Sequence, residues 1–150
     1  MKGGIIMPSL MRRINVISRC AITYKSEMLE GELSGCHHPF VLCISRNPGM
    51  SQDAIARHLC LNKSTVARNL SYLEERGFVR READAVDKRV LRVYPTDKML
   101  CIAPRVREIS AEWNALISEG IGEADFAVFA SVLEKIELRA REIGMDGDKN

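Results

Sequence analysis

The sequence of 150 residues predicts a mostly α-helical protein with one small β-hairpin. Apolar residues recur at intervals of three and four over three long segments, which is the spacing of a helix with one buried face. A shorter helix with a polar outer face ends at Gly77, and two short runs rich in β-branched and aromatic residues follow it. The length and the 46% hydrophobic content suit a single domain over residues 1–150.

The three long segments carry narrow apolar seams. The first seam lies within residues 8–30, approximately, and the other two within residues 97–144. Their members are Leu10, Ile14, Ile17, Ala21, Tyr24 and Met28; then Met99, Ile102, Val106, Ile109, Trp113 and Leu116; then Phe126, Phe129, Leu133, Ile136, Ala140 and Ile143. A seam of this width needs a partner helix, which either a second subunit or the core of the same chain can supply.

A short helix is expected after Ser51, whose side chain can accept hydrogen bonds from the first free amides of the helix. Ile55 and Leu59 give this helix one apolar face. Cys60 and Leu61 then connect it to a second helix. Two helices joined by so short a turn, with the second one polar on its outer side, form a helix-turn-helix.

The second helix has a buried side and a polar side. Val66, Leu70 and Leu73 recur at i, i+4 and i+7, Asn62 is the expected N-cap, and Gly77 can adopt the left-handed conformation that ends the helix. The outward side consists of Lys63, Ser64, Thr65, Arg68 and Asn69. Such a face can enter a DNA major groove, with Arg68 and Asn69 near base edges. By itself, it could equally be an ordinary solvated surface.

A hairpin, or wing, is expected after Gly77. Residues 78–82 and 89–94 form its two runs, and the charged residues 84–88 separate them. Asp87 can orient the guanidinium of Arg89 toward a narrow, electronegative minor groove. An Asp-x-Arg pair without the other parts is usually a solvated surface contact.

Together these parts resemble the MarR family of transcriptional regulators. The matching stretches are PGMSQDAIARHL, LNKSTVARNLSYLEERGFVRR and DKR at residues 87–89, followed by Pro95–Met99, where Thr96 alone remains of a usual Leu-Thr-x-x-Gly. The resemblance implies a winged helix-turn-helix over about residues 36–95 that binds double-stranded DNA. It also implies a homodimer built by the first and last helices, with an inverted repeat as its target.

The predicted site residues follow from this resemblance and from the polar face. For DNA binding they are Ser51, Asn62, Lys63, Ser64, Thr65, Arg68, Asn69, Arg80, Lys88 and Arg89, with Asp87 orienting the wing. Regulators of this family often repress transcription and release DNA when a small amphipathic molecule binds near the junction of dimer base and winged helix. Residues that could line such a pocket are Tyr24, Met28, His38, Phe40 and Trp113, although side chains of these types more often belong to a core.

Thiol oxidation is an alternative trigger. Cys20 precedes Tyr24 by one helical turn, which resembles the peroxide-sensing branch of the family, where tyrosines hydrogen-bond a reactive thiol. The plainer interpretation is a buried, inert cysteine. The five cysteines are expected to be free thiols rather than a disulfide framework.

We expect no metal, no cofactor and no enzymatic activity. Cys36, His37, His38 and Cys43 do not have the spacing of a zinc-finger pair, so one buried His or Cys and one exposed His are expected there. The sequence has no P-loop and no nucleophile elbow. A winged-helix protein-interaction module without DNA binding is the remaining alternative.

Charge and hydropathy agree with a DNA-binding role. Residues 62–92 hold eight basic and five acidic residues. Residues 95–150 hold seven basic and eleven acidic residues. Positive charge is thus concentrated where DNA contact is expected. The sequence has no long apolar run and no signal-peptide core, so we expect a cytoplasmic protein without a membrane partner.

Overall fold

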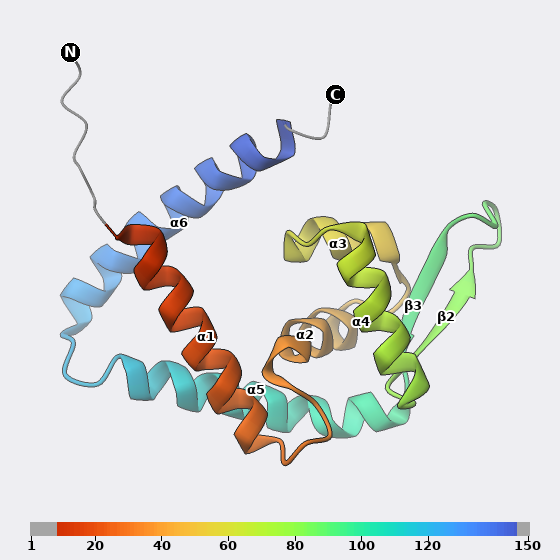
Figure 1. The fold of residues 1–150 in the computed structure, drawn as a ribbon, viewed down its shortest axis with the longest axis horizontal. Coiled ribbons are helices and arrows are strands. Elements are labelled where there is room, and N and C mark those ends of the chain that lie inside the picture. Colours follow the sequence, from red (N-terminus) through yellow and green to blue (C-terminus); the bar gives the residue numbers. More distant parts are fainter. Residues whose placement is uncertain (1–8, 147–150) are drawn as a thin grey trace. The chain divides into compact units, whose positions relative to one another are not determined.

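The computed structural model describes residues 9–146 and confirms the predicted helical fold with a small sheet (Figure 1). In this part of the chain the elements are α1 (Leu10–Met28), the 3-10 turn η1 (Gly35–His37), α2 (His38–Arg46), β1 (Met50–Ser51), α3 (Gln52–Leu59), α4 (Lys63–Glu75), β2 (Val79–Ala83), β3 (Leu91–Pro95), α5 (Asp97–Ile117) and α6 (Glu123–Asp146). The predicted start of the first helix at residue 8 lies outside the described residues. The chain divides into two compact units, the first of which ends at Trp113 and the second of which begins at Asn114.

The sheet has three antiparallel strands in the order β1-β3-β2. In the hairpin Val79 pairs with Pro95 and Ala83 pairs with Leu91, which confirms the predicted wing. The edge strand β1 was not predicted, because two residues are too few to show an alternating pattern. Its Met50 pairs with Val93 and so connects the start of α3 to the wing.

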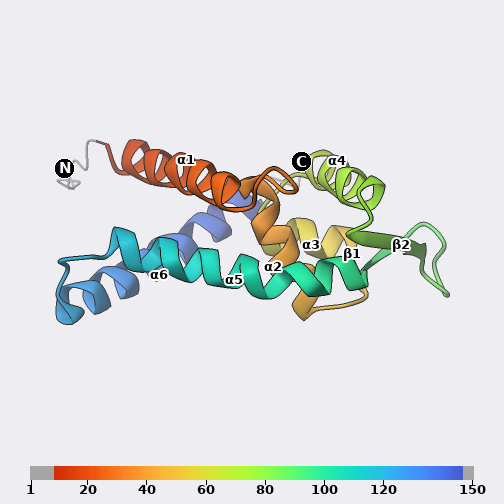
Figure 2. The same ribbon diagram turned by 90° about the horizontal axis from the view of Figure 1, so that it is seen from below.

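The core of the first unit lies where α2, α3, α4, the sheet and α5 meet. Figure 2 shows α5 running past α2, with the hairpin extending away from the helices. Most of the predicted inward positions of the helix-turn-helix are buried, namely Ile55, Val66, Leu70 and Leu73, while Leu59 packs against the core and is partly buried. Other buried members of the core are Phe40, Val41, Ile44, Phe78, Val93, Met99, Val106 and Ile109. The helix that presents the polar face is therefore packed firmly by its apolar side.

The three apolar seams differ in burial. The seam of α5 belongs largely to the core, since Met99, Val106 and Ile109 are buried. In α1, by contrast, no residue is buried, and Ile17 is 50% exposed. In the second unit Phe129 of α6 is 55% exposed. The intrachain-core interpretation thus applies to the seam of α5, whereas those of α1 and α6 present apolar side chains at the surface of the chain.

The expectation that one of the adjacent histidines is exposed was wrong, because both His37 and His38 are buried. The physical reason is the 3-10 turn η1, which packs against α1. The Gly35 amide donates to Ser26 Oγ (2.6 Å), and a Cβ at Gly35 would lie 2.3 Å from the carbonyl oxygen of Ile22. With η1 held against α1, His37 stacks on Tyr72 and both histidines lie inside the protein.

None of the helices within residues 9–146 combines the length and the apolar character that crossing a lipid bilayer requires.

Candidate nucleic-acid interface

Both helices of the helix-turn-helix begin with the predicted side-chain caps. Ser51 Oγ accepts a hydrogen bond from the Ala54 amide (3.1 Å), and Asn62 Oδ1 accepts one from the Thr65 amide (2.7 Å). Between the helices Cys60 has a φ of 52°, a left-handed conformation that reverses the chain after α3. The caps and this turn fix the first residues of α4, which include Lys63 and Ser64, at one exposed end.

The outer face of α4 carries the predicted polar residues. Lys63, Ser64 and Arg68 are exposed, and Lys63 Nζ lies 3.2 Å from Asp53 Oδ2. Asn69 is half-buried, and its Nδ2 donates to the Thr65 carbonyl of the same helix (2.8 Å). One of the two amide hydrogens of Asn69 is thus used within the helix. Lys63 and Arg68 are the exposed cations of this face.

At the tip of the wing Asp87 and Arg89 form the predicted pair. Arg89 Nε donates to Asp87 Oδ1 (3.1 Å) and Nη2 donates to Asp87 Oδ2 (3.2 Å). These hydrogen bonds hold the pKa of Asp87 below its ordinary value, so its carboxylate stays charged. The Arg89 side chain is nevertheless 91% exposed, and Lys88 beside it is exposed as well. The tip thus offers two cations to solvent, one of them with a fixed direction.

The loop of the wing is held in place by Asp84 and Arg92, which sequence reasoning missed. Asp84 Oδ2 accepts from the amides of Val86 and Asp87 (3.1 Å each), and Asp84 Oδ1 pairs with Arg92. These contacts lower the pKa of Asp84 to about 2, with the Arg92 hydrogen bond as the main cause. Arg92 Nη1 also donates to the Gly49 carbonyl (3.0 Å). An aspartate at the start of a turn was the local signal for the first of these contacts.

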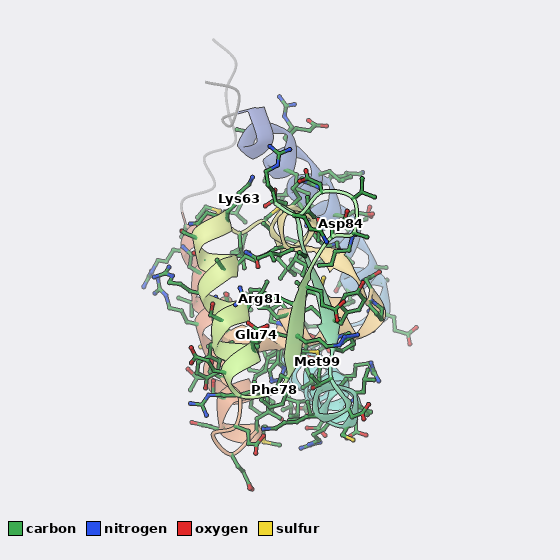
Figure 3. The ribbon with its side chains drawn as sticks, turned by 90° about the vertical axis from the view of Figure 1, so that its right-hand side faces the viewer. Lys63, Glu74, Phe78, Arg81, Asp84 and Met99 are labelled. Atoms are coloured by element: carbon green, nitrogen blue, oxygen red, sulfur yellow. The ribbon has the colours of Figure 1, made fainter. Side chains whose placement is uncertain are left out.

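The neighbouring arginines of β2 lie in different surroundings. Arg80, a predicted DNA-binding residue, pairs with Glu82 (2.9 Å), and its guanidinium lies 4.5 Å from the ring centre of Tyr94. Arg81 instead points toward Glu74 of α4 (Figure 3), with Nη2 2.7 Å from Glu74 Oε2. In the sequence Arg81, unlike Arg80, counted only as positive charge. The partners of Arg81 carry no local sequence signal.

The structure brings together only part of the predicted ligand pocket. The rings of Tyr24 and Trp113 lie 5.4 Å apart. His38 and Phe40 are members of the buried core, while Met28 is at the surface. Two surface hollows are lined by Glu30, Gly31, Glu32, Arg76, Phe78 and Lys98, and by Ser9, Arg12, Arg13, Val16 and Ile17, so none of the five predicted residues borders either.

The cysteines are free thiols, and Cys20 is exposed on α1. Within the described residues Tyr24 makes no hydrogen bond to Cys20, since its ring packs on Trp113 instead. The contact on which the peroxide-sensing resemblance depends is therefore missing there. Residues 9–146 also contain no group of three or more His, Cys, Asp or Glu side chains that could hold a metal ion.

The family model of the MarR family matches residues 39–91, which span α2, the helix-turn-helix and the wing up to the first residue of β3. The chain matches the MarR family across its helix-turn-helix and wing. It is accordingly a winged-helix transcriptional regulator, and the resemblance predicted from the sequence is confirmed.

Similar proteins agree with this assignment over most of the chain. The uncharacterized HTH-type transcriptional regulator YybA of Bacillus subtilis (strain 168) is 22% identical over 131 residues, which cover 87% of each chain. The solved structure of the transcriptional regulator SlyA is 26% identical with a TM-score of 0.86, covering 91% of this chain and 96% of SlyA. A MarR family regulator from Listeria monocytogenes, solved with 26mer DNA, shares the fold at 22% identity and a TM-score of 0.86, covering 96% and 97%.

Proposed function

We propose that this MarR-family regulator is a cytoplasmic homodimer that represses transcription by occupying a pseudo-palindromic DNA site. The observation that carries the proposal is the wing tip, where Asp87 directs an Arg89 side chain that is 91% exposed. A guanidinium held in this way suits a narrow minor groove. The capped start of α4, with Lys63, Ser64 and Arg68 exposed, suits the adjacent major groove. Residues 36–95 would then be the DNA-binding part of one MarR-like domain.

The exposed seams support the dimer. Helices α1 and α6 carry exposed Ile17, Phe126 and Phe129, and apolar rows of this length are typical of helices that pack against a second subunit. A two-fold dimer would place two copies of α4 on half-sites about one helical turn apart, so its target would be an inverted repeat.

A small apolar or aromatic effector would release the DNA. Tyr24 and Trp113, whose rings lie 5.4 Å apart, are the residues that we propose to contact it, because they provide an aromatic surface between α1 and α5. Such a molecule must bind the DNA-incompetent conformation more tightly than the competent one, since equal affinity for both would shift nothing.

Replacing Arg89 with alanine should weaken operator binding about tenfold or more, because about 1–3 kcal/mol is lost with each specific arginine contact. Binding would be followed by fluorescence anisotropy on short DNA from around the coding region, at several salt concentrations. The slope of log affinity against log salt should become shallower, by about one for each lost phosphate contact. Arg139→Ala is the matched control, since Arg139 is an exposed, acid-paired arginine of α6. Equal effects of the two substitutions would contradict a role for the wing tip.

Replacing Phe129 with glutamate should convert the dimer into monomers, since a charge would be placed in an apolar seam. Sedimentation equilibrium measures the mass directly. Val86→Glu, at a wing residue that is 95% exposed, introduces the same charge outside the seam and should leave the dimer intact. A monomeric wild-type protein, or a dimer that tolerates Phe129→Glu, would count against the proposed assembly.

A further inference from the structure

Arg81 differs from the other basic residues of the wing in its burial. Its side chain is 18% exposed, compared with 53% for Arg80 and 91% for Arg89. The alternation of a strand explains the contrast with Arg80, since successive side chains point to opposite faces. Arg81 therefore faces the helices, and its charge is not presented to solvent like that of the other two arginines.

The guanidinium of Arg81 connects three elements (Figure 3). Nε and Nη2 donate to Glu74 Oε2 at 2.9 and 2.7 Å, and Nη2 also lies 3.2 Å from Ser71 Oγ on the same helix α4. Nη1 donates to Gln52 Oε1 at the start of α3 (3.3 Å). The second oxygen of Glu74 accepts from the Arg81 amide (3.0 Å), so that the carboxylate binds both the backbone and the side chain of β2.

This arrangement depends on the shape of the guanidinium as well as on its charge. The hydrogen bonds from Arg81 lower the pKa of Glu74, so that the carboxylate is ionised at neutral pH. A planar fork can bind Glu74, Ser71 and Gln52 at once, whereas a lysine ammonium is a single point charge at the end of a flexible chain. A lysine at this position would keep the charge and lose part of the connection.

We propose that Arg81 is a positioning residue that sets the direction of α4 relative to α3 and the wing, and that DNA affinity depends on it without a contact to DNA. The proposal rests on the DNA-binding function proposed above. It assigns the two consecutive arginines of β2 different tasks: Arg80 is on the exposed side, and Arg81 determines how the outer face of α4 is presented.

The test compares Arg81→Lys, Arg81→Gln and Glu74→Gln with wild type in the anisotropy titration, using the full chain. All three should lose about tenfold or more in affinity while the salt dependence keeps the wild-type slope, because no phosphate contact is removed. Titration at DNA concentrations far above Kd gives the competent fraction of each preparation, which separates a loss of affinity from a loss of folded protein. Arg80→Gln is the matched comparison and should make the slope shallower.

Coupling between the partners provides the second measurement. The Glu74→Gln, Arg81→Gln double variant should bind DNA about as well as either single variant, since both substitutions break the same connection. If Arg81→Gln does not fold, the DNA affinity and salt slope of the nearly isosteric Glu74→Gln variant are compared with those of wild type instead. Wild-type affinity in Arg81→Lys, a shallower salt slope in Arg81→Gln, or additive losses in the double variant would each overturn the proposal.

A readout without DNA separates this proposal from the proposed function. Amide hydrogen exchange in α3 and α4 should accelerate in Arg81→Lys and Glu74→Gln, and remain unchanged in Arg80→Gln. If wild type bound no DNA but the exchange rates changed in this pattern, the DNA-binding function would fail while the connection of α3, α4 and β2 by Arg81 would stand. Unchanged exchange together with tight wild-type DNA binding would remove the positioning role alone.

Discussion

Replacing Phe40 with alanine is expected to lower the free energy of unfolding by about 3–5 kcal/mol. The ring of Phe40 is 1% exposed and belongs to the core formed by α2, α3, α4 and α5. Its removal would take apolar area out of the core and leave a cavity that the surrounding helices can fill only in part. Urea denaturation followed by circular dichroism at 222 nm measures the loss, with the slope of the linear extrapolation checked for a two-state transition.

Met28→Ala is the matched control, because Met28 was predicted for the same ligand pocket but is 36% exposed. This substitution should cost less than about 1 kcal/mol, in the range of changes at the protein surface. A loss below about 1 kcal/mol in Phe40→Ala would contradict the core assignment and favour the pocket role predicted from the sequence.

Acidification from pH 7 to pH 4 should remove about 3 kcal/mol of stability through His38. Burial lowers the pKa of this ring to about 4 from 6.5, with smaller contributions from the charges of Lys25 and His37, while the backbone of Lys25 acts in the opposite direction. Between those two pH values the unfolded chain binds a proton that the folded chain does not. The unfolding free energy is therefore complete above pH 6.5 and decreases as the pH falls. Burial and the charge of Arg76 lower the pKa of His37 and add a loss of the same sign.

The His38→Leu variant isolates this contribution from that of the carboxylates. The stability difference between pH 7 and pH 4 should be about 3 kcal/mol smaller than in wild type, when measured by urea titration across the range. At pH 7 the variant should be no less stable, because neither ring nitrogen of His38 has a hydrogen-bond partner of normal geometry, and leucine removes that cost. Equal pH dependence in His38→Leu and wild type would show that His38 is not a source of acid sensitivity.

The parts of the fold that could be predicted are those with local signals. The caps at Ser51 and Asn62 and the left-handed Gly77 depend on residues within three or four positions along the chain. The Asp87–Arg89 pair spans two residues and was equally accessible. For the same reason the hairpin and the buried face of α4 agree with the structure.

The parts that could not be predicted depend on residues distant in sequence. Arg81 binds partners that lie 7, 10 and 29 positions away, and Arg92 reaches the Gly49 carbonyl across 43 positions. The inward orientation of His37 depends on stacking against Tyr72, with ring centres 4.5 Å apart. Composition and spacing identify such side chains as basic or aromatic, but they do not identify the surface on which each one packs.

The anchoring of the wing loop by Asp84 and Arg92 has a consequence for binding entropy. Asp84 and Arg92 hold the loop end of the hairpin, and Arg92 also binds the Gly49 carbonyl, before any partner arrives. A loop that is already ordered loses little conformational freedom on binding. In a flexible loop, each side chain that becomes fixed adds an entropic cost of about 0.5–1.5 kcal/mol to the binding free energy. The electrostatic attraction between the tip cations and a polyanion is therefore offset only slightly by the entropic cost of ordering the loop. Removing the contacts of Asp84 and Arg92 should weaken association even though the charge at the tip stays the same.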